Sequence, residues 1–250
     1  MTTSLQMDVG NTYAKWRVRH AGEIIARGGY AHGDNAGREA MLHSVTGVDH
    51  IWLASVAGAE LEHELAGLLR QQWRVEPWFA RTPAVFAGLT NSYAEPERMG
   101  VDRWLAMLGA RARCGGRICV VDAGSALTID LVAADGRHEG GYIIPGPALM
   151  ERALLLDTDR VRFDDDVAYA LPPGTSTAAA VRHGIAVAQV GAVTVALRQA
   201  GNPAPRLFFC GGAGKTLMAL LGQDADHAPD LVFEGLELMA ASVAASGAQI

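Results

Sequence analysis

The chain has 250 residues and a formal net charge of −6, and half of its residues are apolar. A general nucleic-acid binder needs a basic surface that neutralises phosphates, so this acidic balance argues against that class of protein. The length allows one large domain or two small ones, each with a hydrophobic core of its own.

The first half of the chain combines strand patterns with helix patterns. The alternation of polar and apolar residues from Lys15 to Arg19 is typical of a half-buried strand. Leu61, Leu65, Leu68 and Leu69 recur with helical spacing and indicate an amphipathic helix. We expect strands at 5–9, 14–20, 23–30, 50–56 and 75–80, and helices at 38–45 and 60–73.

The second half has a similar order of elements without being a sequence repeat. We expect strands at 118–121, 128–133, 141–145 and 206–210, and helices at 149–156, 177–198 and 234–246. Helices interleaved with strands predict α/β layers. We place the boundary at Gly115-Gly116, where the chain can turn, which gives an N-terminal domain at 1–115 and a C-terminal domain at 116–250.

The three cysteines have spacings that fit neither a redox pair nor a zinc site, so we expect free thiols. They are Cys114, Cys119 and Cys210. The sequence shows no signal peptide and no apolar run of the ~20 residues that a membrane span needs. We therefore expect a cytoplasmic protein that binds no membrane and no nucleic acid.

Two segments have the pattern of a strand that ends in Asp-x-Gly and runs into a tight turn. The first aspartate turn comprises Asp8, Val9, Gly10, Asn11, Thr12, Tyr13, Ala14 and Lys15, and the second aspartate turn runs from Asp122 through Ser125 to Thr128. Backbone N–H groups of such turns can bind phosphate, while the aspartate can hold a cation. A ligand-free hairpin explains the first turn alone equally well. Two such turns, one in each half, indicate two related halves that face one nucleotide.

Four segments together resemble the type III pantothenate kinase family, which belongs to the acetate and sugar kinase, Hsc70 and actin superfamily. They are DVGNTYAK at 8–15, GVDR at 100–103, DAGSALTID at 122–130 and GGYIIPG at 140–146. The resemblance implies two ribonuclease H-like (actin-like ATPase) domains, each a mixed five-stranded sheet with flanking helices. It also implies a homodimer that uses ATP to phosphorylate pantothenate, the first step of coenzyme A biosynthesis.

Residues 8–15 resemble the family's phosphate-1 turn, which implies that they bind ATP and that Asp8 holds Mg²⁺. Residues 122–128 resemble the phosphate-2 turn. There the resemblance implies that Asp122 binds a monovalent cation, K⁺ or NH₄⁺, and that Ser125 contacts ATP. Ser125 departs from the more usual threonine but keeps the hydroxyl. Gly211-Gly212 resembles the adenosine-side glycine turn, with Cys210 in place of a more usual threonine.

The GVDR segment supplies the chemistry of the phosphate acceptor. A hydroxyl that attacks the γ-phosphorus must lose its proton, and the carboxylate of Asp102 can take it. Arg103 can bind a carboxylate or a phosphate bidentately. Without the flanking segments, an ordinary aspartate at a helix N-terminus would explain Asp102 better. The resemblance implies pantothenate contacts from Tyr93, Gly100, Val101, Asp102, Arg103 and, across the dimer interface, Thr177.

Ser176 replaces the asparagine that is usual in the family, and Ser176 or Thr177 can simply cap a helix.

Three other hypotheses about function remain beside a pantothenate kinase. An actin-like module could act as a non-catalytic regulator, or the kinase could use a sugar or small acid. A P-loop is the weakest alternative, because Phe209 stands where its first glycine is required before Gly214-Lys215-Thr216. The eight histidines show no metal-type spacing, and we expect no functional role for them.

Overall fold

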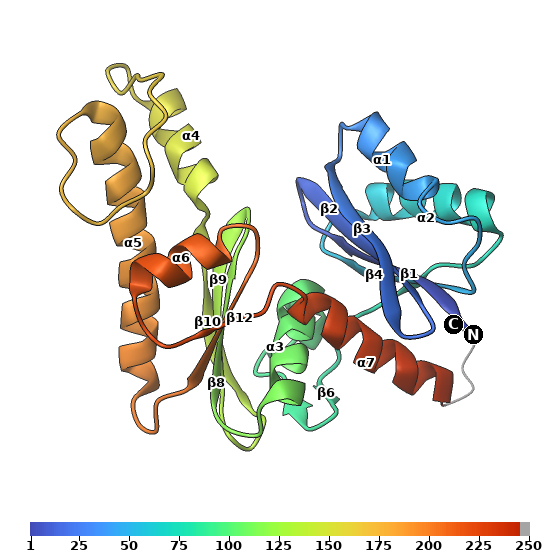
Figure 1. The fold of residues 1–250 in the computed structure, drawn as a ribbon. Helices are drawn as coiled ribbons and strands as arrows, with labels where there is room; N and C mark the ends of the chain where they lie inside the picture. Colours follow the sequence, from blue (N-terminus) through green and yellow to red (C-terminus); the bar gives the residue numbers. More distant parts are fainter. Residues whose placement is uncertain (246–250) are drawn as a thin grey trace. The chain divides into compact units, whose positions relative to one another are not determined.

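The structure, a computed structural model, describes residues 1–245 as two compact units (Figure 1). Unit 1 contains Met1–Ala84, Tyr93–Gly109 and the chain from Leu231 onward, and unit 2 contains Val85–Ser92 and Ala110–Asp230. One change of unit, between Gly109 and Ala110, lies close to the boundary expected at 115/116. The last helix, which the expected domains place in the C-terminal half, groups instead with unit 1.

Unit 1 is built on a mixed five-stranded sheet in the order β3-β2-β1-β4-β5. The strands are β1 (Thr3–Val9), β2 (Tyr13–His20), β3 (Glu23–Ala31), β4 (His50–Ser55) and β5 (Trp78–Phe79). The first three are antiparallel, whereas β4 is parallel to β1 and β5 is parallel to β4. The helices are α1 (Asn35–Leu42), α2 (Ala59–Trp73), the short 3-10 helix η1 (Pro96–Arg98), α7 (Leu231–Ala245) and α3 (Val101–Arg113), of which the residues up to Gly109 belong to unit 1.

The two faces of strand β1 carry different kinds of side chain. Leu5 and Met7 are fully buried in an apolar core that includes Met41 of α1 and Leu69 of α2. Successive side chains of a strand point to opposite faces, so Gln6 lies on the other face. There it donates to Glu237 of α7 at 2.8 Å, which places α7 against that side of the sheet.

A buried polar network joins this face of the sheet to α7. The guanidinium of Arg17, 4% exposed, donates to Gln6 at 2.7 Å and to the Glu237 carboxylate at 2.8 Å. It also lies over the ring of Phe233, 4.7 Å from the ring centroid. A buried cation is costly unless a carboxylate and hydrogen bonds compensate it, so α7 is an integral part of unit 1.

Unit 2 repeats the architecture of unit 1, with the sheet order β10-β9-β8-β11-β12 and the same strand directions. Its strands are β8 (Ile118–Ala123), β9 (Ala126–Val132), β10 (His138–Pro145), β11 (Arg206–Cys210) and β12 (Asp226–His227), with a small separate hairpin of β6 (Val85–Phe86) and β7 (Leu89–Thr90). The helices are α4 (Pro147–Asp157), α5 (Thr177–Ala200) and α6 (Gly214–Leu221). The expected fold class, two mixed five-stranded sheets with flanking helices, is confirmed.

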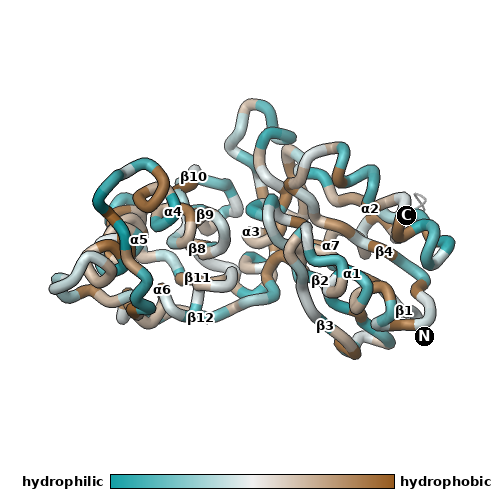
Figure 2. Tube along the Cα trace, turned by 90° about the horizontal axis from the view of Figure 1, so that it is seen from above, coloured by the Kyte–Doolittle hydropathy of each residue, from teal (hydrophilic) through white to brown (hydrophobic). Residues whose placement is uncertain are grey.

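Hydrophobic and hydrophilic stretches alternate along both strands and helices, and α1 is mainly hydrophilic (Figure 2). The core of unit 2 includes Val121, Ile129, Val193 and Phe209, from the sheet and from α5. Helix α6 is not among the expected elements, because its first residues look like a glycine-rich loop. It forms because Leu217 buries its side chain against the same core. The helix expected at 234–246 begins earlier, and residue 246 lies outside the described residues.

All three cysteines are free thiols, as expected. Burial, together with the carboxylate of Asp130, raises the pKa of the Cys119 thiol to about 12. A thiol with such a pKa stays protonated at neutral pH and is a poor nucleophile.

Candidate active site

The first aspartate turn is a short connection between β1 and β2. The N–H of Gly10 donates to the carbonyl of Tyr13 at 3.0 Å, which closes the turn. Asp8 and Lys15 are direct partners across the two strands, so opposite charges face each other at its base. Asn11 and Thr12 are exposed at its tip. These polar groups surround a backbone turn of the kind that can bind phosphate oxygens.

His32, just beyond the end of β3, makes two hydrogen bonds to this turn. Its backbone N–H donates to the carbonyl of Thr12 at 3.3 Å, and its ring Nε2 lies 2.7 Å from the carbonyl oxygen of Gly10. A carbonyl oxygen only accepts, so Nε2 carries the hydrogen. The sequence assigned His32 no role, because this contact arises only when β3 pairs with β2.

The start of α3 lies at the same edge of the sheet as the first aspartate turn. The backbone N–H of Val56 donates to the carbonyl of Val9, at the end of β1, at 3.0 Å. A side-chain carbon placed on Gly100 would lie 3.5 Å from the same Val56 and 2.6 Å from an oxygen of Asp102. Unit 1 therefore brings together the first turn and the GVDR segment, with Gly100 leaving room for the Asp102 carboxylate.

Asp102, Arg103 and Tyr93 form a connected polar cluster. Asp102 is half-buried and accepts from the backbone N–H of Arg103 at 2.8 Å. The Arg103 side chain, in a residue 6% exposed, donates to the Tyr93 hydroxyl at 3.0 Å and lies 5.8 Å from the centre of its ring. Val101 beside them is buried. A cation held by a phenol oxygen beside a carboxylate can orient a polar acceptor molecule.

The second aspartate turn has the corresponding position in unit 2, between β8 and β9. The N–H of Gly124 donates to Ala126 at 2.9 Å, and the N–H of Gly146 donates to the carbonyl of Ser125 at 3.1 Å. Gly146 precedes α4 and ends the GGYIIPG segment, whose residues belong mainly to β10. A side-chain carbon on Gly146 would lie 2.6 Å from the Ser125 carbonyl oxygen, so only glycine fits there.

Gly211 packs directly on this turn from the end of β11. It has a φ of +79°, and a side-chain carbon there would lie 2.6 Å from the Ala123 carbonyl and closer still to the Asp122 carboxylate. The next residue, Gly212, has open space around it. Asp122 also pairs with Cys210 in the parallel register of β8 and β11. Of these two glycines, Gly211 is therefore the one that the packing requires.

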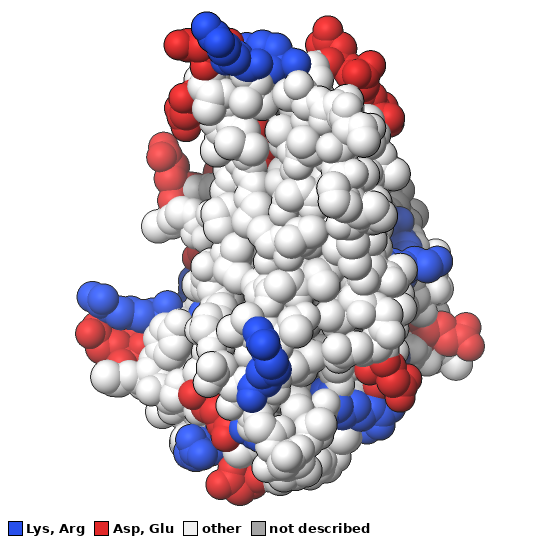
Figure 3. Space-filling view, turned by 90° about the vertical axis from the view of Figure 1, so that its left-hand side faces the viewer, with Lys and Arg blue, Asp and Glu red and all other residues white. Residues whose placement is uncertain are grey.

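Thr177 is the first residue of α5 and is exposed. Ser176 caps that helix, since its hydroxyl accepts from the N–H of Ala179 at 3.2 Å. Thr177 also lines a cavity of about 1020 Å³ between α4 and α5, together with Leu149, Ile185 and other mainly apolar residues. On the side of the molecule where α4 and α5 lie, Figure 3 shows a broad area without charged side chains, with charges at its margins.

Within residues 1–245, no cluster of three or more His, Cys, Asp or Glu side chains could hold a metal on its own. Asp8 and Asp122 each offer a carboxylate at a phosphate-type turn. Each carboxylate, within its own unit, can be one ligand of a cation that takes its remaining ligands from phosphates and water, as Mg²⁺ usually does in nucleotide sites.

Sequence comparison identifies close relatives over nearly the whole chain. The family model of type III pantothenate kinase matches residues 4–199. A type III pantothenate kinase of Alcanivorax borkumensis is 41% identical over 243 residues, which cover 95% of this chain and 98% of that protein. One from Thiobacillus denitrificans is 38% identical, with 94% and 95% covered.

Structural comparison supports the same fold at lower identity. A Baf family protein of Campylobacter jejuni has a TM-score of 0.63 and 22% identity, with 97% of this chain and 98% of that chain covered. The activator of 2-hydroxyisocaproyl-CoA dehydratase from Clostridium difficile, solved with bound ADPNP, has a TM-score of 0.56 and 11% identity, with 98% and 96% covered.

Proposed function

Because the chain belongs to the type III pantothenate kinase family, whose members phosphorylate pantothenate for coenzyme A biosynthesis, we propose specific roles for its site residues. The observation that carries the proposal is the position of Asp102. It is the second residue of α3, whose start lies at the same sheet edge as the first aspartate turn, and it belongs to a cluster with Arg103 and Tyr93. A kinase needs a phosphate-binding turn and an acceptor base in this kind of proximity.

ATP binds through its phosphates to the first aspartate turn (residues 8–15) and to Ser125 of the second. Backbone N–H groups and the Lys15 ammonium contact the phosphate oxygens, and His32 keeps the Gly10 carbonyl in place. Mg²⁺, when bound, neutralises the charge of the phosphate oxygens, and Asp8 is its protein ligand. Asp122 binds a monovalent cation, K⁺ or NH₄⁺.

Asp102 is the general base. One carboxylate oxygen accepts from the backbone N–H of Arg103, which fixes the orientation of the group. The carboxylate removes the proton of the pantothenate hydroxyl as that oxygen attacks the γ-phosphorus. Arg103, held by Tyr93, binds the carboxylate of pantothenate or the transferred phosphate, while Gly100 and Val101 shape the pocket around it.

The protein is a homodimer in which α4 and α5 form the interface. Both helices expose large apolar side chains: Leu149, Leu154, Leu156, Val187 and Val195. Contrary to the expectation from the sequence, one of the described helices, α5, is long and apolar enough to cross a membrane by length and composition, and only 28% of its most apolar window is buried. A second copy that covers this face accounts for the exposure, and Thr177 then contacts the partner's pantothenate. The free thiols suit a cytoplasmic enzyme.

The test is an ADP-release assay with ATP and pantothenate, with and without K⁺. We expect Asp102→Asn to bind ATP like the wild-type protein while its turnover falls by about 10²–10⁴-fold, the usual contribution of a general base. Wild-type turnover in this variant contradicts the base assignment. In the wild-type protein, ADP release that does not depend on pantothenate instead favours another acceptor, and no ADP release favours the non-catalytic regulator.

A further inference from the structure

Unit 2 contains a chain of three hydrogen-bonded side chains that has no part in the roles proposed above. The hydroxyl of Ser92 lies 2.8 Å from Nδ1 of His138, and Nε2 of His138 lies 3.0 Å from Oδ1 of Asp130. His138 is fully buried and Asp130 is 1% exposed, whereas Ser92 is exposed. We call this series the His138 chain.

The direction of the two hydrogen bonds depends on the tautomer of His138. When Nε2 of His138 carries the hydrogen, it donates to the Asp130 carboxylate. In the neutral imidazole, Nδ1 then accepts from the Ser92 hydroxyl. Asp130 orients the buried ring, and the ring in turn holds a surface residue at one defined place.

The segment that ends at Ser92 is attached to unit 2 along its length. Leu89 is fully buried, and the N–H of Thr90 donates to the carbonyl of Gly136 at 3.0 Å. A side-chain carbon on Gly136 would collide with the carbonyl of Gly88. The hydrogen bond from Ser92 to His138 is the last of these attachments along the segment.

The next residue, Tyr93, is bound within unit 1, where its hydroxyl accepts from Arg103 at 3.0 Å. Two consecutive residues are therefore each held by a side-chain hydrogen bond, Ser92 to His138 and Tyr93 to Arg103. Backbone motion of Ser92 is transmitted to Tyr93 through the one peptide bond that joins them. The phenol of Tyr93 is the group that we assign to the pantothenate pocket.

We propose that the His138 chain is a positioning device for the acceptor site, with Ser92 as the positioning residue that keeps Tyr93 on Arg103. The inference rests on the proposed role of Tyr93 in pantothenate binding. Neither Ser92 nor His138 contacts a substrate in this scheme. The His138 chain therefore affects binding of pantothenate and not binding of the ATP phosphates.

Ser92→Ala removes a single exposed hydroxyl and leaves the buried residues intact. We expect KM for pantothenate to rise about three- to tenfold, the range that one neutral hydrogen bond supports, with KM for ATP and kcat unchanged. Ser92→Thr retains the hydroxyl and should restore the wild-type KM. Ser44→Ala is the matched control, since it removes a hydroxyl that donates to the Met41 carbonyl at 2.6 Å, outside the proposed site.

A double-mutant cycle with Tyr93→Phe tests the route of the effect. If the His138 chain acts through the Tyr93 hydroxyl, adding Ser92→Ala to Tyr93→Phe raises KM no further. Equal KM values in Ser92→Ala and wild type, equal rises for both substrates, or full additivity in the cycle each overturn the inference. An unchanged KM in Tyr93→Phe alone overturns the assignment of Tyr93 and with it this route. A raised KM in Tyr93→Phe together with a wild-type Ser92→Ala overturns the inference only.

Discussion

Replacing Gly211 with alanine tests how tightly the second aspartate turn is packed. Gly211 has a φ of +79°, and an added side-chain carbon would lie 2.6 Å from the carbonyl of Ala123. The same carbon would press on the carboxylate of Asp122, the proposed ligand of the monovalent cation. The variant should therefore lose both stability and affinity for ATP.

The magnitude follows from three contributions. A non-glycine residue in the left-handed region costs about 1–2 kcal/mol. Displacing the Ala123 backbone in a close-packed region costs a further ~1–3 kcal/mol. Alanine also restricts the unfolded chain, which returns about 0.4–1 kcal/mol. The sum is a loss of about 3 kcal/mol in the free energy of unfolding, or about 6–12 °C in melting temperature for a chain of this size.

The assay compares Gly211→Ala with Gly212→Ala in thermal unfolding and in KM for ATP. A side chain at Gly212 meets open space, so that variant should stay within about 0.5 kcal/mol of the wild-type protein. If both variants melt at the same temperature and bind ATP alike, the close packing of Gly211 on the turn has no energetic weight.

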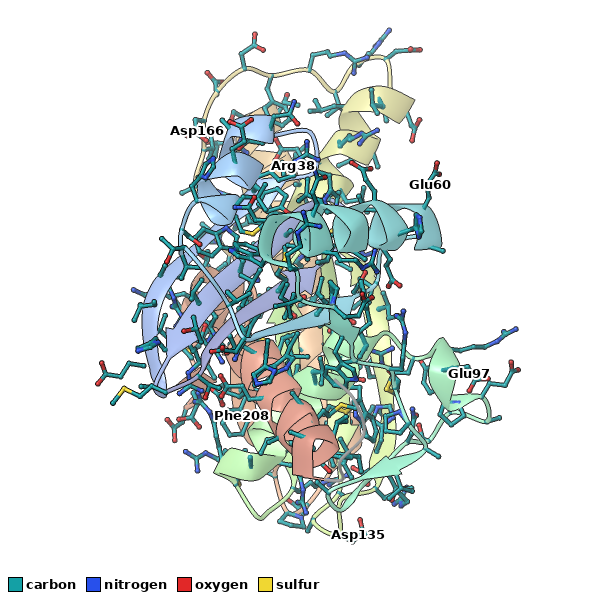
Figure 4. The ribbon with its side chains drawn as sticks, turned by 90° about the vertical axis from the view of Figure 1, so that its right-hand side faces the viewer. Arg38, Glu60, Glu97, Asp135, Asp166 and Phe208 are labelled. Atoms are coloured by element: carbon teal, nitrogen blue, oxygen red, sulfur yellow. The ribbon has the colours of Figure 1, made fainter. Side chains whose placement is uncertain are left out.

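Two further predictions concern residues that hold elements of unit 1. His32→Ala should raise KM for ATP about three- to tenfold and leave KM for pantothenate unchanged, because one hydrogen bond to the first turn is lost. The control is His63→Ala, since His63 is exposed. Equal KM values for the two variants would contradict a role of His32 in the turn. Glu237→Gln should lower the free energy of unfolding by about 2–4 kcal/mol, measured in urea, because the buried guanidinium of Arg17 loses its carboxylate. Glu97→Gln, whose side chain projects from the surface in Figure 4, should have no effect, and a similar loss in both variants would refute the reasoning.

The longer strands and the two aspartate turns could be predicted because their signals are local. Apolar residues alternate along β1 and β2, and the Asp-x-Gly pattern begins in the last two residues of β1 and of β8. Leu65 and Leu69 lie on one face of α2 and are both buried, as their spacing predicts. Each of these features depends on residues that are neighbours in the sequence or one helical turn apart.

The roles of two histidines could not be predicted, because they depend on pairing between distant segments. His32 reaches Gly10 only after β3 has paired with β2, and His138 meets Ser92 across 46 positions of sequence. Histidines that do not cluster in the sequence give no local sign of such contacts. The grouping of α7 with unit 1 has the same origin, since apolar spacing shows that a helix is amphipathic but not which sheet it covers.

The return of α7 to the first sheet has a consequence for the order in which the protein can be completed during synthesis. Most of unit 2 comes from one continuous stretch, Ala110–Asp230, so its sheet can close while the last residues are still being translated. The packing of unit 1 is completed later, because Arg17 is synthesised early and Glu237, whose carboxylate accepts from it, is synthesised near the end. A nascent chain that stops before α7 therefore lacks the carboxylate that accepts from the buried Arg17 guanidinium, which gives the quality-control machinery of the cell a chemical difference between unfinished and finished copies.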